Sequence, residues 1–65
     1  MKYKLKEAFL SHADGHIKKH VANVLVFLEN PAGVGEHGDL LETVKNEAKK
    51  IADNEEVISV LKKYF

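Results

Sequence analysis

The sequence contains no cysteine and no tryptophan, has a single proline, and carries no excess of either charge. Without cysteine, the chain can form neither a disulfide nor a thiolate metal site, so its 65 residues must fold on a small apolar core or with the help of a partner. Ten basic and ten acidic residues cancel, whereas a nucleic-acid binder of this size normally needs a positive excess for its phosphate contacts. We therefore expect no nucleic-acid partner.

Long apolar runs are also missing. The longest one, Val24 to Leu28, is far shorter than the roughly 20 residues of a membrane-spanning helix. The basic start at residues 1–6 is followed by polar residues and not by the uninterrupted apolar stretch of a signal peptide. These features predict a cytoplasmic protein with no membrane partner.

Loop-forming residues gather in one segment, residues 30–38, which holds the only proline and three of the four glycines. Pro31 disfavours helical geometry at Asn30 and therefore ends any helix that precedes it. Asp39, with Glu42 three residues later, has the pattern of a capping box at the start of a second helix. The sequence thus predicts one loop at residues 30–38, flanked by two helical segments.

The second segment has the periodicity of an amphipathic helix over about residues 39–64. At about 100° per residue, one set of apolar residues shares a single stripe. Its members are Leu40, Val44, Ile51, Ile58 and Phe65. Charged residues such as Lys49 and Asp53 fall on the opposite side, which we expect to face solvent.

The first segment, about residues 3–29, has an apolar arc of about half the helix circumference, wider than one partner helix can cover. The candidate interaction surface on this segment comprises Phe9, Ile17, Val21, Val24, Phe27 and Leu28. Two helices of similar length with a short connection predict an all-α antiparallel hairpin. The uncovered arc predicts a homodimer that completes a four-helix bundle. A three-helix monomer, with the first helix broken at Gly15, is the alternative.

The loop matches the G-x-G-x-x-G motif of dinucleotide-binding sites, in which glycines let the backbone approach a pyrophosphate. The candidate loop residues are Gly33, Gly35, Glu36, His37, Gly38 and Asp39. The motif normally follows a strand directly, whereas four residues separate it from the valine-rich run 21–28, and the chain is too short for a doubly wound sheet. The acidic residues also suit the positive end of the second helix. We expect no cofactor.

Three histidines recur at intervals of four in the first segment: His12, His16 and His20. Histidines spaced in this way can chelate a divalent metal, and Glu47 or Glu55 of an antiparallel second helix could add a carboxylate. The interpretation that we favour is that the rings pack at the edge of the core, on Phe9 and Phe27, and we therefore expect no bound metal. A small metal- or nucleotide-binding protein, using this face or the glycine loop, remains the alternative function.

The segment 30–39, NPAGVGEHGD, followed by an amphipathic helix that ends LKKYF, resembles small uncharacterised proteins of tailed phages that infect marine cyanobacteria. The resemblance covers roughly His16 to Phe65. It implies an accessory protein made in the host cytoplasm, either a host-takeover factor or a minor virion component, and it implies no catalytic residues. We therefore expect a non-catalytic helical module that self-associates and presents a surface to a protein partner.

Overall fold

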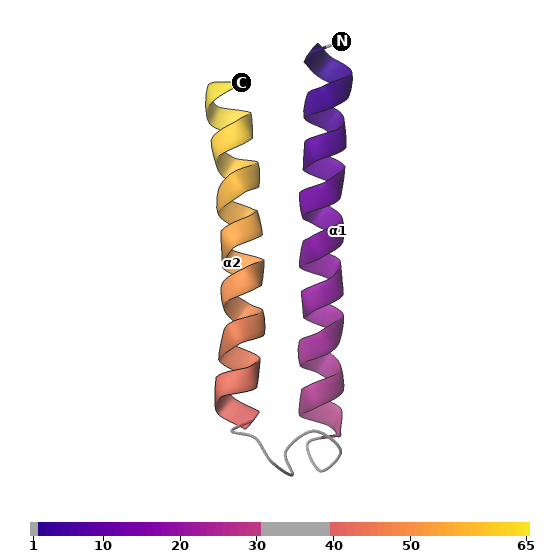
Figure 1. Ribbon diagram of the computed structural model, residues 1–65, viewed down its shortest axis with the longest axis vertical. Helices are drawn as coiled ribbons and strands as arrows, with labels where there is room; N and C mark the ends of the chain where they lie inside the picture. The colour runs from indigo at the N-terminus through magenta and orange to yellow at the C-terminus, as the bar shows by residue number, and fades with distance from the viewer. Residues whose placement is uncertain (1, 31–39) are drawn as a thin grey trace.

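The computed structural model describes residues 2–30 and 40–65 of the chain. These residues form two helices, α1 (Lys2–Glu29) and α2 (Leu40–Tyr64), which lie side by side and antiparallel (Figure 1). The start of α1 and the end of α2 lie at one end of the pair, here called the terminal end. Glu29 and Leu40 lie at the other, the loop end. The described residues contain no strand, so the all-α helical hairpin is confirmed.

The helix boundaries lie within one residue of those predicted from the loop chemistry and the periodicity. α1 continues through Gly15, so the three-helix alternative is wrong. A glycine inside a helix costs about 1 kcal/mol relative to alanine, but here the turns on both sides are held against α2 by the buried Ala13 and the half-buried Ile17. Residues 21–28 are helical as well, so no strand precedes the glycine motif.

The two helices meet along one seam, in which buried and half-buried residues are spaced alternately four and three apart. In α1 the series is Lys6, Leu10, Ala13, Ile17, His20, Val24 and Phe27, and in α2 it is Leu40, Val44, Glu47, Ile51, Asn54, Ile58 and Leu61. This 3.5-residue repeat is the spacing that keeps one stripe of each helix facing its partner in a coiled coil. The hairpin is therefore a short antiparallel coiled coil with several polar residues in its seam.

The contact between His20 and Glu47 fixes the register of the seam. Counting outward along both helices from this contact places Leu10 opposite Ile58, and these two residues do line a common hollow. The same count places Lys6 opposite Leu61, which also share a hollow. One register thus accounts for contacts over at least four turns of each helix.

The hairpin buries little of its surface. In the described part of the chain, Ala13 and His20 are the only buried residues, with 4% and 7% of their surface exposed. The accessible surface is 5276 Å², compared with about 4,200 Å² for a compact monomer of 7.3 kDa. Each helix therefore covers a single stripe of the other, and a large apolar area stays in contact with solvent.

Candidate functional site

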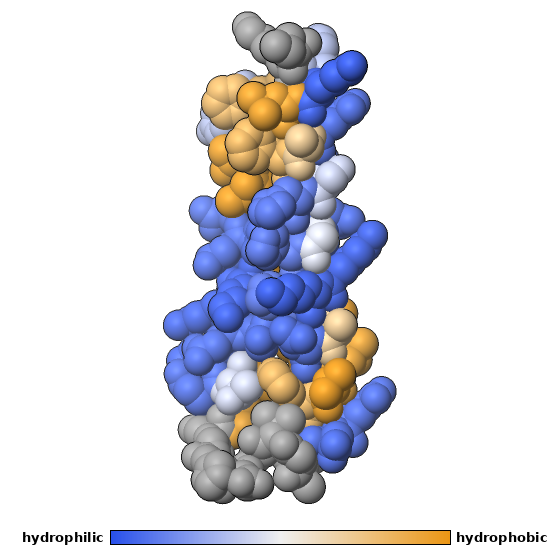
Figure 2. All heavy atoms as spheres, turned by 45° about the vertical axis from the view of Figure 1, so that its right-hand side comes forward, coloured by the Kyte–Doolittle hydropathy of each residue, from blue (hydrophilic) through white to orange (hydrophobic). Residues whose placement is uncertain are grey.

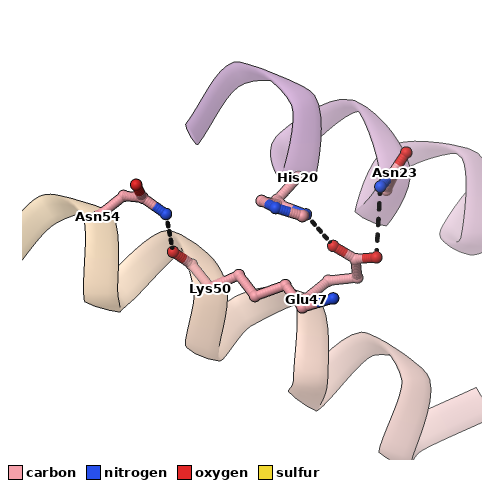
Figure 3. Close-up of polar contacts among 5 residues, drawn as sticks. All are labelled: His20, Asn23, Glu47, Lys50 and Asn54. Atoms are coloured by element: carbon pink, nitrogen blue, oxygen red, sulfur yellow. Dashed lines mark hydrogen bonds and ion pairs between the residues drawn. The ribbon is translucent and has the colours of Figure 1, made fainter. Parts of the chain in front are cut away.

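The centre of the seam is a polar layer made by His20, Asn23 and Glu47 (Figure 3). The His20 ring donates through Nδ1 to Glu47 Oε2, and Asn23 Nδ2 donates to Glu47 Oε1 over 3.3 Å. Both oxygens of a carboxylate on α2 are thus bound by side chains of α1. This layer links one position along α1 to one position along α2. A polar residue in a coiled-coil seam fixes the register because its partner is available at that position alone.

The environment of Glu47 favours its ionised form. Burial by itself would raise the pKa of this carboxyl group, whereas the hydrogen bond and charge interaction with His20 lower it. The hydrogen bond from Asn23 and the charge of Lys50 act in the same direction, so the pKa lies below its ordinary value of 4.5. None of the hollows described below is lined by His20 or Glu47. The arrangement is that of a structural clamp.

The predicted histidine face is present, but it divides into two parts. His20 is buried in the seam, whereas His12 is exposed and His16 half-buried, with the Nε2 atoms of this outer pair 3.0 Å apart. The His16 ring stacks on the His20 ring, with the centroids separated by 6.2 Å and the planes inclined by 22°. Glu47 therefore bonds to His20 and not to the outer pair, and Glu55 is exposed on α2.

A hollow beside the outer pair is lined by Ser11, His12, Gly15, His16 and Lys19. Gly15 leaves it open, since a Cβ added there would meet no atom within 4 Å. Among the described residues, no group of three or more histidine or acidic side chains is arranged to hold a metal ion.

Apolar side chains from both helices gather near the terminal end. Three hollows there share residues with one another: Leu61 belongs to two of them, and Leu5 and Phe9 also belong to two. We call this continuous surface the terminal patch, and it consists of Tyr3, Leu5, Phe9, Val57, Val60, Leu61, Tyr64 and Phe65. Figure 2 shows apolar side chains towards this end and again towards the loop end, with a polar belt between them.

The second apolar area follows α1 towards the loop end. Val21, Leu25 and Leu28 succeed one another at i, i+4 and i+7, which places them on one stripe of the helix, and they are 40%, 52% and 59% exposed. We call this set the loop-side stripe. It comes from one helix and contains no aromatic residue, whereas both helices supply the terminal patch.

The candidate interaction surface predicted on α1 divides between the seam and the outside. Ile17, Val24 and Phe27 are half-buried in the seam, and the other three residues, Phe9, Val21 and Leu28, are exposed. Sequence reasoning missed the α2 half of the terminal patch. A signal was present, because Val57, Val60, Leu61 and Tyr64 form a second apolar stripe at i, i+3, i+4 and i+7.

The candidate loop residues Gly33, Gly35, Glu36, His37, Gly38 and Asp39 lie outside the described residues. In the part of the chain that is described, no helix is long and apolar enough to cross a bilayer. No protein-family model matches this chain, and neither the curated proteins nor the solved structures gave a match. The proposals below therefore depend on the geometry and the sequence of this chain.

Proposed function

We propose that this chain is a non-catalytic helical interaction module that self-associates through its terminal patch into a four-helix bundle. The observation that carries the proposal is the exposed area. The hairpin exposes about 1,100 Å² more than a compact chain of its mass would. A standard protein–protein interface covers about 800 Å² on each partner. One interface with a second copy is therefore of the size needed to cover the excess.

The terminal patch is better suited to this contact than the loop-side stripe. Phe9 and Tyr64 stand 55% and 67% exposed within it, and aromatic residues, tyrosine in particular, are enriched at the points that carry most binding energy in interfaces. The patch also includes an open hollow of about 530 Å³ between the two helices. A second copy could therefore contribute side chains to a preformed depression.

The polar features of the hairpin support a binding role over catalysis. A catalytic site needs a reactive group in a concave pocket that excludes water. Here His20 and Glu47 bind each other in the seam, and the larger hollows are apolar surface depressions. With the resemblance to phage proteins, this function would belong to an accessory factor made in an infected cell.

The experiment is light scattering on the untagged protein across a range of micromolar concentrations. We expect a mass of about twice 7.3 kDa. Val60→Glu, on the terminal patch and 41% exposed, should give a monomer. Val26→Glu is the matched control, because Val26 is 56% exposed and lies outside the patch, and this variant should remain a dimer.

Circular dichroism of each variant shows whether the helices persist. A wild-type protein that stays monomeric and helical at several hundred micromolar would overturn the self-association proposal. Dimerisation of Val60→Glu at wild-type concentrations would overturn the assignment to the terminal patch and leave self-association itself intact.

A further inference from the structure

We propose that His12 and His16 form a two-ligand binding site for a divalent ion of the zinc, nickel or copper class. The two residues are one helical turn apart, so their side chains lie on the same face of α1. Their Nε2 atoms are 3.0 Å apart, in a hydrogen bond that one ring donates to the other, so the donating ring must release its Nε2 proton before both nitrogens can bind one ion. Two imidazole nitrogens that bind one ion at 2.0–2.1 Å are separated by about 2.9 Å at an octahedral ion and about 3.3 Å at a tetrahedral one. The donor atoms thus already stand at nearly the distance that chelation requires.

The pair is held in this position from within the fold. The His16 ring stacks on that of His20, and His20 is fixed in turn by Glu47 on the other helix. Ordered supporting residues behind the ligands raise metal affinity because the ligands lose less freedom on binding. His12 lies one turn further out, with its ring edge-on to that of His16 and the centroids 4.5 Å apart.

The space in front of the pair is open to an ion and its water ligands. Gly15 contributes no side chain to the hollow, and a Cβ there would meet nothing within 4 Å. Lys19 borders the same hollow, and its positive charge opposes a bound cation. Because the Lys19 side chain is exposed and flexible, it can turn into solvent, so it weakens the site without blocking it.

The donor chemistry defines the class of ion. Imidazole nitrogens suit zinc, nickel and copper, whereas magnesium and calcium prefer oxygen ligands. With two protein ligands, the remaining coordination positions are taken by water. The site does not depend on the proposed dimer, since both ligands belong to one helix of one copy. His12 also borders a hollow of the terminal patch, so a bound ion would lie at the rim of that surface.

The test is a titration of the histidine ring resonances with ZnCl₂, followed by NMR, together with calorimetry of NiCl₂ binding. We expect the His12 and His16 rings to shift together at the lowest zinc concentrations and His20 to change less. His12→Gln and His16→Gln should each weaken nickel binding at least about tenfold, because each removes half of the protein ligands. Lys19→Gln should tighten binding several-fold. MgCl₂ should leave all the rings unchanged.

The variants also guard against two simpler explanations. His12 is exposed, so His12→Gln should retain the wild-type helix content and melting temperature in the absence of metal, and its lost binding then reflects the missing ligand. Unchanged nickel binding in both His→Gln variants would overturn the proposal. So would a zinc titration in which His37 responds and the His12 and His16 rings do not.

Discussion

The seam and the terminal patch differ in a way that is unusual for a compact single-chain protein. Polar side chains occupy buried positions of the seam, and large apolar side chains of the terminal patch are exposed. The most buried positions include His20, in contact with Glu47, whereas Phe9 and Tyr64 remain mostly exposed. Buried polar pairs contribute little net stability but can specify one arrangement. We infer that the polar pair in the seam fixes the register of the two helices. Much of the apolar surface that could stabilise them stays exposed.

Asn54 is a polar residue that α2 contributes to the seam. It is half-buried in the seam, and its Nδ2 donates to the carbonyl oxygen of Lys50 over 2.7 Å. By the register of the seam it lies opposite Ala13, whose small side chain leaves room for it. A polar residue that is satisfied within its own helix avoids the cost of an unpaired buried group. It adds little to apolar burial.

The largest effect should come from the apolar part of the seam. Ile58→Ala should lower the free energy of unfolding by about 2 kcal/mol, the lower end of the range for emptying a buried aliphatic site, because Ile58 is half-buried. Lys49→Ala, on the exposed side of α2, should change it by less than about 0.5 kcal/mol. Urea unfolding at one fixed protein concentration measures both. Equal losses in the two variants would contradict the assigned seam.

The terminal patch and the loop-side stripe are compared by Phe9→Ala and Leu25→Ala, at positions that are 55% and 52% exposed. Phe9→Ala should raise the dimer dissociation constant on the order of tenfold, since a truncated interface anchor costs more than about 1 kcal/mol. Leu25→Ala should leave it nearly unchanged. Sedimentation equilibrium gives both constants, and the reverse ranking would move the interface to the loop-side stripe.

The polar layer can be tested by replacing both of its central members. The double variant His20→Leu with Glu47→Leu should be as stable as the wild type or more stable, because apolar replacements of a buried pair avoid the desolvation of its charge. His20→Leu alone should be clearly less stable, because it takes the ring donor from the Glu47 carboxylate. Urea midpoints of these three proteins and of Glu47→Leu alone form a double-mutant cycle. A double variant no more stable than the single one would show that the pair itself stabilises the fold.

The smallest expected effect is on the loss of stability at low pH, through Glu47. The pKa of Glu47 is lowered below 4.5 in the fold, mainly by His20 acting against the effect of burial. The unfolded chain therefore binds more protons as the pH falls. The contribution of this group is fully present above about pH 4.5 and is lost as the pH drops through the lower folded value. Urea midpoints at pH 5.5 and 3.5 should fall less for Glu47→Gln than for the wild type. Glu55→Gln, an exposed control, should behave as the wild type does.

The hairpin and its boundaries could be predicted because one segment held the chain's only proline and most of its glycine. The apolar stripe of α2 was predicted well at Leu40, Val44, Ile51 and Ile58, all of which are half-buried. Phe65 was assigned to the same stripe but is 78% exposed. It follows the last helical residue and lies in an open hollow that it shares with Tyr3 and Leu5 of α1.

The polar members of the seam could not be found by hydrophobicity, which places polar residues on the outside. The antiparallel pairing predicted that Glu47 or Glu55 could approach the histidine face, and the structure sets Glu47 against His20. The spacing did contain the information. Glu47 and Asn54 fill the gaps in a strict repeat of four and three residues between Val44 and Ile58.

The rod shape of the hairpin determines how its assembly can be observed. The chain measures 48 × 15 × 14 Å, with a radius of gyration of 14.9 Å, compared with about 11 Å for a compact chain of this length. A rod experiences more drag than a sphere of equal mass, so a single hairpin would elute early from a sizing column and resemble a dimer. In small-angle X-ray scattering, two rods side by side double the forward intensity with little change in radius of gyration, whereas two rods end to end increase both.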